Sequence, residues 1–285
     1  MLLSDYNQGI LIQVGIGVLL ALGYWIAANT GRFSFGHAGF MAIGAYAASI
    51  LTMKMGWPLP LAMLAGAVPA GAAGALIGLA ALRLSLLYLA IVTLAFASLV
   101  QVLLGNWSYV GGDSGLSGMS GTSLPLVAIC VAVLIGYLWL VSRSRVGLAY
   151  SALREDEDAA RASGLNTTRI EVWAFTQSAF VTGIAGALSA HYLLFISPAA
   201  FSPQQSLLII LYVVLGGLLV FYGPVLGATL LVLFPIYLTF LKDWYMFVYG
   251  GLLIVLMIAR PQGIADGRGQ WRRWFARRSF VRVER

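Results

Sequence analysis

The chain has 285 residues, of which 60% are hydrophobic and 9% are charged, with a formal net charge of +7. A soluble domain carries roughly 25% charged residues, so this composition excludes an ordinary water-soluble fold. The apolar runs are continuous rather than alternating, which disfavours a transmembrane β-barrel. The sequence therefore predicts an all-α, polytopic transmembrane helix bundle.

A helix needs about 20 apolar residues to cross the hydrocarbon core of a bilayer. By this measure we expect about nine spans, within a range of about eight to ten. They are expected near residues 9–29, 38–55, 59–81, 84–105, 124–142, 170–195, 206–222, 224–241 and 244–259. No cleavable signal peptide is expected, because the first ten residues contain Asp5 but no lysine or arginine. Cys130, the only cysteine, falls inside a span, where a small buried side chain is the favoured interpretation.

The positive charges suggest an orientation. If residues 143–169 lie inside and the spans alternate from there, every arginine falls inside and only Lys54 and Lys242 fall outside. Cytoplasmic loops collect positive charge, so we expect the N-terminus outside and the C-terminus inside. Residues 1–265 form the expected permease domain, and residues 266–285 form a basic cytoplasmic tail that suits anionic lipid. Contact of the tail with a cytoplasmic partner is the alternative.

Small and polar residues mark packing and loops. Gly66, Ala70, Gly74 and Gly78 recur every fourth residue, a spacing that lets helix backbones approach closely. Packing inside one subunit is favoured over a subunit interface. Residues 106–123 and 197–205 are polar and contain no lysine or arginine, so both are expected to be external loops. The segment 222–224 is the expected turn between two late spans, with Pro224 starting the next helix.

Enzyme chemistry finds little support. The histidines, His37 and His191, are far apart in sequence, and no Cys/His spacing suggests a metal site. A phosphate-binding loop needs Gly-Lys-Ser/Thr, but Lys54 precedes Met55 and Lys242 precedes Asp243. We therefore expect no catalytic residues, no metal and no cofactor on this chain.

Polar residues inside spans are costly and are therefore candidates for function. Gln101 and Gln177 are expected to form hydrogen bonds between helices, and Thr93 can bond its own backbone four residues back. Residues 31–40 combine glycine, serine and histidine between two apolar runs, which suggests irregular backbone. A membrane tolerates such backbone where it is buried in protein or lines a watery path. A plain cytoplasmic turn is the alternative interpretation.

The segment 143–169 is polar and charged. Its alanine content and mixed charges favour a short amphipathic helix over 153–164, with Gly164 as its stop. Such a helix is either a solvated surface element or a docking element for a cytoplasmic engine. The pattern alone leaves both open.

A family resemblance favours docking. Asp158-Ala159-Ala160-x-x-x-Gly164 resembles the EAA-x-x-x-G signature of ABC importer permeases, with Asp in place of the leading Glu. With Arg154-Glu155-Asp156 before it and Leu165-Asn166 after it, the loop resembles the LivM-type permeases of branched-chain amino-acid ABC importers. Further matching segments are 33–40, 44–46, 87–96, 111–118, 214–217, 222–228 and 260–264. Residues 28–31 and 218–221 depart from the family pattern.

The resemblance implies a transport subunit without its own ATPase site. It would sit in a bacterial inner membrane beside a second, usually non-identical permease, two cytoplasmic ATPases that bind ATP and Mg, and an external solute-binding protein. The residues that would couple to the ATPase are Arg154, Glu155, Asp156, Asp158, Ala159, Ala160 and Gly164. Candidate substrate-pathway residues are Ser34, His37, Thr93, Gln101 and Gln177. The two external loops are the expected landing surface for the binding protein.

Several alternatives stay open for the cargo and the energy source. Branched-chain or other hydrophobic amino acids are the leading solutes, with urea, short amides and small organic acids as alternatives. An ion-coupled secondary transporter is the alternative class. It is disfavoured because no intramembrane carboxylate stands out as an ion site. A channel is disfavoured because no repeated filter sequence is evident.

Overall fold

The computed structural model describes residues 5–81, 84–238, 250–251, 254 and 263–265, and this part of the chain is mostly helical. The helices are α1 Asp5–Ala28, α2 His37–Met55, α3 Leu59–Ala81, α4 Leu86–Asn106, α5 Leu124–Ser142, α6 Arg145–Glu155, α7 Glu157–Ala162, α8 Thr167–Leu193, α9 Pro203–Gly216 and α10 Tyr222–Leu238. Short 3-10 turns cover Ser108–Val110, Gly112–Ser114 and Pro198–Phe201, and two short strands are β1 Leu116–Ser117 and β2 Phe195–Ile196.

Five of these helices, α1 to α5, are long and apolar enough to cross a membrane. Helix α8 is longer than any of them, but its polar side chains lower its hydropathy. Helices α9 and α10 are apolar and shorter. Every predicted span up to residue 241 thus corresponds to one helix, while the predicted span 244–259 and the tail 266–285 lie essentially outside the described residues.

The centre of the bundle is built from α1, α2, α3 and α8, which share the largest contacts. Glycines make this packing possible: a Cβ on Gly66 would lie 2.7 Å from the backbone nitrogen of Ala48 on α2. A Cβ on Gly74 would overlap the side chain of Ala179 on α8. The predicted small-residue stripe of α3 is therefore an interface inside this chain, as favoured from the sequence.

Helices α4 and α5 lie at the outside of this centre. In each candidate span an 18-residue stretch is apolar enough to cross the membrane. Only 22% of this stretch is buried in α4 and 17% in α5, against 72% in α1. Helix α5 packs mainly on α1 and α6, and α4 mainly on α2. Large apolar side chains such as Leu103, Ile129 and Val133 are therefore left on the outer surface, as expected beside lipid.

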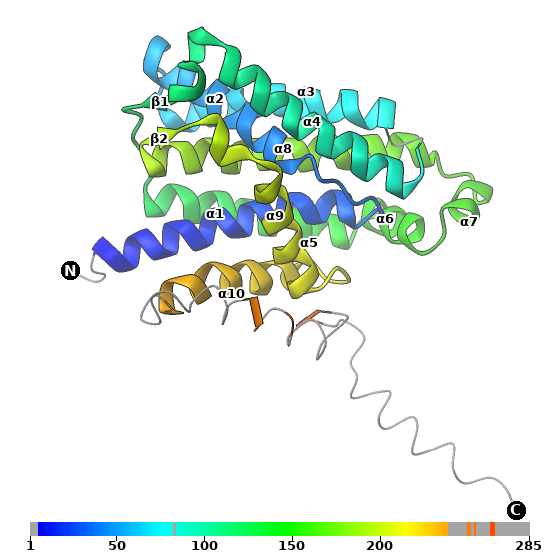
Figure 1. Cartoon of the computed structure of the whole chain (residues 1–285). Helices are drawn as coiled ribbons and strands as arrows, with labels where there is room; N and C mark the ends of the chain where they lie inside the picture. Colours follow the sequence, from blue (N-terminus) through cyan, green and yellow to red (C-terminus); the bar gives the residue numbers. More distant parts are fainter. Residues whose placement is uncertain (1–4, 82–83, 239–249, 252–253, 255–262, 266–285) are drawn as a thin grey trace, which may run out of the picture.

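The two ends of the bundle differ. Helices α6 and α7 lie at one end, and β1 and β2 lie at the other (Figure 1). The strands pair antiparallel, with Leu116 opposite Ile196 and Ser117 opposite Phe195. Strand β2 directly precedes the second segment expected to be an external loop, and the 3-10 turns of the two expected loops contact each other, so the two segments form one surface.

The junction between α9 and α10 lies slightly earlier than predicted. Helix α9 ends at Gly216 and α10 already begins at Tyr222, so the turn covers residues 217–221 instead of 222–224. Trp25 near the end of α1 donates its indole N–H to the Leu218 carbonyl at 2.8 Å. The backbone N–H groups of Ile264 and Ala265 donate to the carbonyls of Leu215 and Gly216, each at 2.9 Å.

Candidate functional site

The first part of the site is the connection between α1 and α2. Residues 32–36 have no regular secondary structure, yet Ser34 and the following His37 are fully buried. The predicted irregular backbone is confirmed, and part of it is buried inside the protein. Buried backbone needs hydrogen-bond partners, and these come from other helices.

Three hydrogen bonds tie this connection to its neighbours. The backbone N–H of Phe35 donates to Thr93 Oγ1 on α4 at 2.9 Å. The backbone N–H of Ala38 donates to Ser206 Oγ on α9 at 2.9 Å. His37 Nε2 lies 2.8 Å from Ser178 Oγ on α8. We call this cluster of Ser34, His37, Thr93, Ser178 and Ser206 the polar centre.

Aromatic rings enclose the His37 imidazole. Its centroid lies 4.6 Å from that of Tyr24, 5.7 Å from that of Phe40 and 6.4 Å from that of Phe175. Thr93 also donates its hydroxyl to the Leu89 carbonyl at 2.8 Å, which is the predicted backbone bond. The polar centre can therefore position hydroxyls and one imidazole inside an otherwise apolar bundle, without a charged group.

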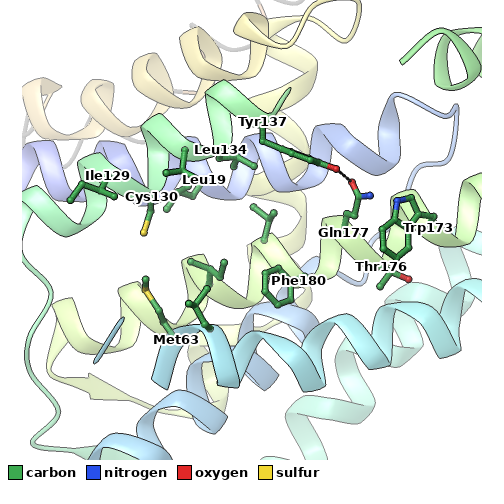
Figure 2. A pocket seen from close by; sticks show the side chains of 14 residues that line it. Leu19, Met63, Ile129, Cys130, Leu134, Tyr137, Trp173, Thr176, Gln177 and Phe180 are labelled. Carbon is green, nitrogen blue, oxygen red and sulfur yellow. Dashed lines mark hydrogen bonds between the residues drawn. The ribbon is translucent and has the colours of Figure 1, made fainter. Parts of the chain in front are cut away.

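The structure brings together Ser34, His37 and Thr93 but not the two predicted glutamines. Gln177 accepts a hydrogen bond from the Tyr137 hydroxyl on α5 at 2.7 Å, confirming its expected role between helices (Figure 2). Gln101 is half-buried on α4 and has no hydrogen bond to any residue that the structure describes. Ser178 and Ser206 escaped the sequence analysis because single serines are common in apolar helices.

Gln177 and Tyr137 lie instead on a groove of about 600 Å³ between α5 and the helices α1, α3 and α8 (Figure 2). Its wall is almost entirely apolar and includes Leu19, Met63 and Phe180. Cys130 also lines it and is only half-buried, whereas a small buried side chain was expected.

The second part of the site is the loop 143–166, which holds α6 and α7. The single helix predicted over 153–164 is wrong: the chain breaks at Asp156, whose carboxylate oxygen accepts the Ala159 N–H at 3.0 Å and caps α7. An aspartate bonded in this way favours starting a new helix over continuing the old one. Gly164 is a stop as predicted, with a left-handed φ of +85° and its N–H donating to the Arg161 carbonyl at 3.0 Å.

The predicted coupling residues divide into two groups. Glu155, Asp156, Asp158, Ala159 and Gly164 are exposed on the loop, whereas Ala160 is buried. Arg154 points inward, and its Nη1 donates to Asn29 Oδ1 at the end of α1 at 2.6 Å. Tyr150 and Leu153 on α6 are buried, and burial raises the pKa of the Tyr150 hydroxyl above its ordinary value.

An ion network that the sequence analysis missed joins the two parts. Arg32 Nη2 lies 2.8 Å from Glu157 Oε2 on α7, and Arg32 Nε lies 2.9 Å from Glu171 Oε1 on α8. Glu171 is 3% exposed and falls inside the predicted span 170–195. The expectation that no carboxylate stands out in a span therefore needs correction. A glutamate at the second position of the predicted span was the available signal.

This arrangement is that of a multi-pass membrane bundle with a buried polar centre, to which one folded polar loop is tied. The family model described as "Branched-chain amino acid transport system / permease component" matches residues 7–257, and the chain belongs to this family. It is thus a transport component and not an enzyme.

Two curated relatives have the same printed name, "High-affinity branched-chain amino acid transport system permease protein LivM". The protein from Salmonella typhimurium is 35% identical over 297 residues, covering 90% of this chain and 67% of the relative. The protein from Escherichia coli is 33% identical over 293 residues, with the same coverage. No solved structure matches the chain.

Proposed function

We propose that this chain is one of two permease subunits of an ATP-driven importer in a bacterial inner membrane, and that it moves branched-chain or other hydrophobic amino acids inward. Two cytoplasmic ATPases, binding ATP and Mg, would supply the energy, and an external binding protein would deliver the solute. The observation that carries this proposal is the loop 143–166. It presents exposed acidic side chains outward while its inner side is bonded to the bundle.

The exposed side of the loop supports a docking role. Glu155 has a side chain that is 60% exposed, and Asp158 is exposed on α7. Ion pairs at such exposed positions are each worth only about 0–1 kcal/mol, so they select and orient a partner but do not hold it alone. The buried face of α6, including Tyr150 and Leu153, supplies the rigidity that docking needs.

The opposite end of the bundle suits the external binding protein. Strands β1 and β2 bring residues 106–123 and 195–205 together there, and Lys54 donates to the Tyr109 carbonyl at 2.8 Å on the same surface. With the loop 143–166 inside, this surface faces outward, which agrees with the distribution of arginine described above.

The leading cargo is a hydrophobic amino acid because both relatives are named for branched-chain amino acids. The polar centre offers neutral hydroxyls and an imidazole, which also suit urea, short amides or small organic acids. An ion-coupled transporter is the less favoured class. The carboxylate of Glu171 is already paired with Arg32, whereas an ion site would need it free.

The test of the proposed function is purification of the tagged chain from its native membranes in mild detergent, followed by mass spectrometry. We expect two ATPase polypeptides and a second permease to be retained, and a binding protein to be recovered with its solute. Recovery of the chain alone, with sodium- or proton-dependent uptake in vesicles, would contradict it.

The docking surface is tested separately by charge reversal. Glu155→Lys combined with Asp158→Lys should reduce retention of the ATPase at least about tenfold, because several rim contacts of about 0–1 kcal/mol each are replaced by repulsion. Arg169→Glu, exposed at the start of α8 and outside the docking set, is the matched control. Unchanged retention in the double variant would remove the loop from the docking surface.

A further inference from the structure

We infer that Arg32 is a positioning residue that links movement of α7 to the polar centre, through its two ion pairs with Glu157 and Glu171. This inference rests on the proposed function, because it assigns to α7 the role of receiving the movement of the ATPase. It concerns how that movement reaches the helices that surround His37.

Arg32 is placed to join three elements. It lies in the connection between α1 and α2, Glu157 lies on α7, and Glu171 lies on α8. Its two contacts, at 2.8 and 2.9 Å, use different nitrogens of one guanidinium, so the side chain is held in a fixed orientation. A shift of α7 relative to α8 therefore acts on the planar Arg32 guanidinium through these bonds.

The two ion pairs differ in their surroundings. The Arg32 side chain is 14% exposed and that of Glu171 is 3% exposed, while that of Glu157 is 34% exposed. The pair with Glu171 is therefore the buried anchor, because separating it would leave a carboxylate unpaired in the protein interior. The pair with Glu157 is the outer contact, which can follow movements of α7.

A second contact reinforces the same connection. Arg154 on α6 donates to Asn29 at 2.6 Å, and a Cβ placed on Gly31 would lie 3.5 Å from the Arg154 Cα. Gly31 has a left-handed φ of +84°, a conformation that glycine adopts without strain. The turn that carries Arg32 is therefore packed directly against the loop 143–166, with little room to move independently.

The polar centre begins immediately after Arg32. Phe35, His37 and Ala38 are bonded to helices α4, α8 and α9 respectively. A displacement of the 29–35 turn therefore acts directly on the Phe35 contact, which lies two residues before that of His37. Coupling between distant sites travels through such contiguous packed and hydrogen-bonded elements. The path from α7 to the polar centre is only a few residues long.

The variant that tests the link most directly is Glu157→Ala. It removes the contact to α7 and leaves the buried pair of Arg32 and Glu171 intact, so folding is preserved. In the purified complex reconstituted with its binding protein, we expect normal ATPase retention and continued ATP hydrolysis. Uptake of radiolabelled leucine per ATP hydrolysed should fall at least about fivefold, roughly a kilocalorie per mole of lost coupling by RT ln 5.

Arg161→Gln is the matched control. Arg161 Nη2 contacts the other oxygen of Glu157 at 2.7 Å from an exposed position, so the variant removes the neighbouring ion pair and spares Arg32. We expect its uptake per ATP to stay within twofold of the parent. Arg32→Lys keeps the charge but cannot contact both carboxylates in the same fork, so an intermediate loss is expected.

The outcomes separate the inference from the proposed function. Unchanged uptake per ATP in Glu157→Ala would overturn the inference and leave docking intact. Loss of ATPase retention in parallel with uptake would also overturn it, because Glu157 would then be a docking contact. If Glu157→Ala and Arg32→Lys combined are no worse than Arg32→Lys alone, both residues act in one path, as inferred. Failure of the Glu155 and Asp158 reversals would instead count against the proposed function.

Discussion

Composition and burial are related in opposite ways in two parts of the bundle. Helices α4 and α5 are very apolar and exposed, whereas α2 and α8 are more polar and buried. The outer helices α4 and α5 are the most apolar of the candidate spans, yet only 22% and 17% of their membrane-crossing stretches are buried. Helix α2 is the least apolar of the five candidate spans, and 56% of its membrane-crossing stretch is buried. Helix α8 carries Ser178, Thr182 and His191, all fully or nearly fully buried.

This inversion teaches what holds the molecule together. Lipid tails are as apolar as leucine, so burying an apolar side chain between helices gains little in a membrane. Helices α2 and α8 therefore use glycine for close approach and polar groups for hydrogen bonds, while the outer helices use leucine and isoleucine to face lipid. Helix α1, which is apolar and 72% buried, does not follow this inversion. The predictions below test each part of this difference.

The largest effect is expected where the inner helices touch. A Cβ on Gly44 of α2 would overlap the backbone of Gly183 on α8, so Gly44→Leu cannot be accommodated without separating the two helices. We expect a loss of at least about 3 kcal/mol and little monodisperse protein by fluorescence-detected size exclusion. Gly136→Leu on α5 is the control, because a Cβ there meets nothing within 4 Å. Equal yields of both variants would refute the contrast.

The next effect concerns the buried charge pair. Arg32→Ala leaves the carboxylate of Glu171 unpaired at 3% exposure, and we expect a loss of about 3 kcal/mol, measured as a lower thermal midpoint in detergent. Arg161→Ala removes an ion pair in which the arginine is 60% exposed and should cost at most about 1 kcal/mol. Adding Glu171→Gln to Arg32→Ala should recover part of the loss, and a further decrease would argue against the pairing.

A smaller effect is expected in the polar centre. Ser178→Ala removes the partner of His37 Nε2 in a fully buried position, which should cost about 1–2 kcal/mol. Among the described residues, Ser98 on α4 bonds only its own helix, to the Leu94 carbonyl at 3.2 Å, from a partly exposed position. Ser98→Ala should therefore leave the thermal midpoint unchanged. A similar shift in both variants would mean that the hydrogen bond to His37 contributes nothing.

The smallest effect is expected for the hydrogen bond between the outer and inner helices. Tyr137→Phe removes the bond from α5 to Gln177 on α8 and should cost about 0.6 kcal/mol, a typical value for such bonds in membranes. Its thermal midpoint should shift far less than that of Ser178→Ala. A larger shift would show that α5 depends on this bond because it has few other contacts with α8.

The sequence predicted the fold well because helix position follows from hydropathy alone. Every predicted span up to residue 241 corresponds to a helix, and the Gly66–Gly78 stripe packs as expected. Details that depend on single side chains were not predicted. The capping carboxylate of Asp156 divides the expected helix, and Asp156 followed by the acidic Glu157 and Asp158 was the available local signal for a new helix start.

The candidate site was predicted only where a motif or an unusual composition marked it. The glycine- and histidine-containing segment 31–40 and the loop 143–169 stood out, and the structure places them in contact. Arg32 and Glu171 are 139 positions apart, and their pairing follows from the packing of α1, α2 and α8. Whether an arginine points to solvent or into the protein cannot be inferred from its neighbours in sequence.

The short segment 263–265 has a practical consequence for placing the molecule in its membrane. Ile264 and Ala265 are bonded to the end of α9, and Trp25 joins that junction to the end of α1, close to the turn that contacts Arg154. The described residues 263–265 therefore lie at the same end of the bundle as α6. A single reporter enzyme inserted directly after Ala265 would therefore assign one compartment to this segment and to the loop 143–166 together.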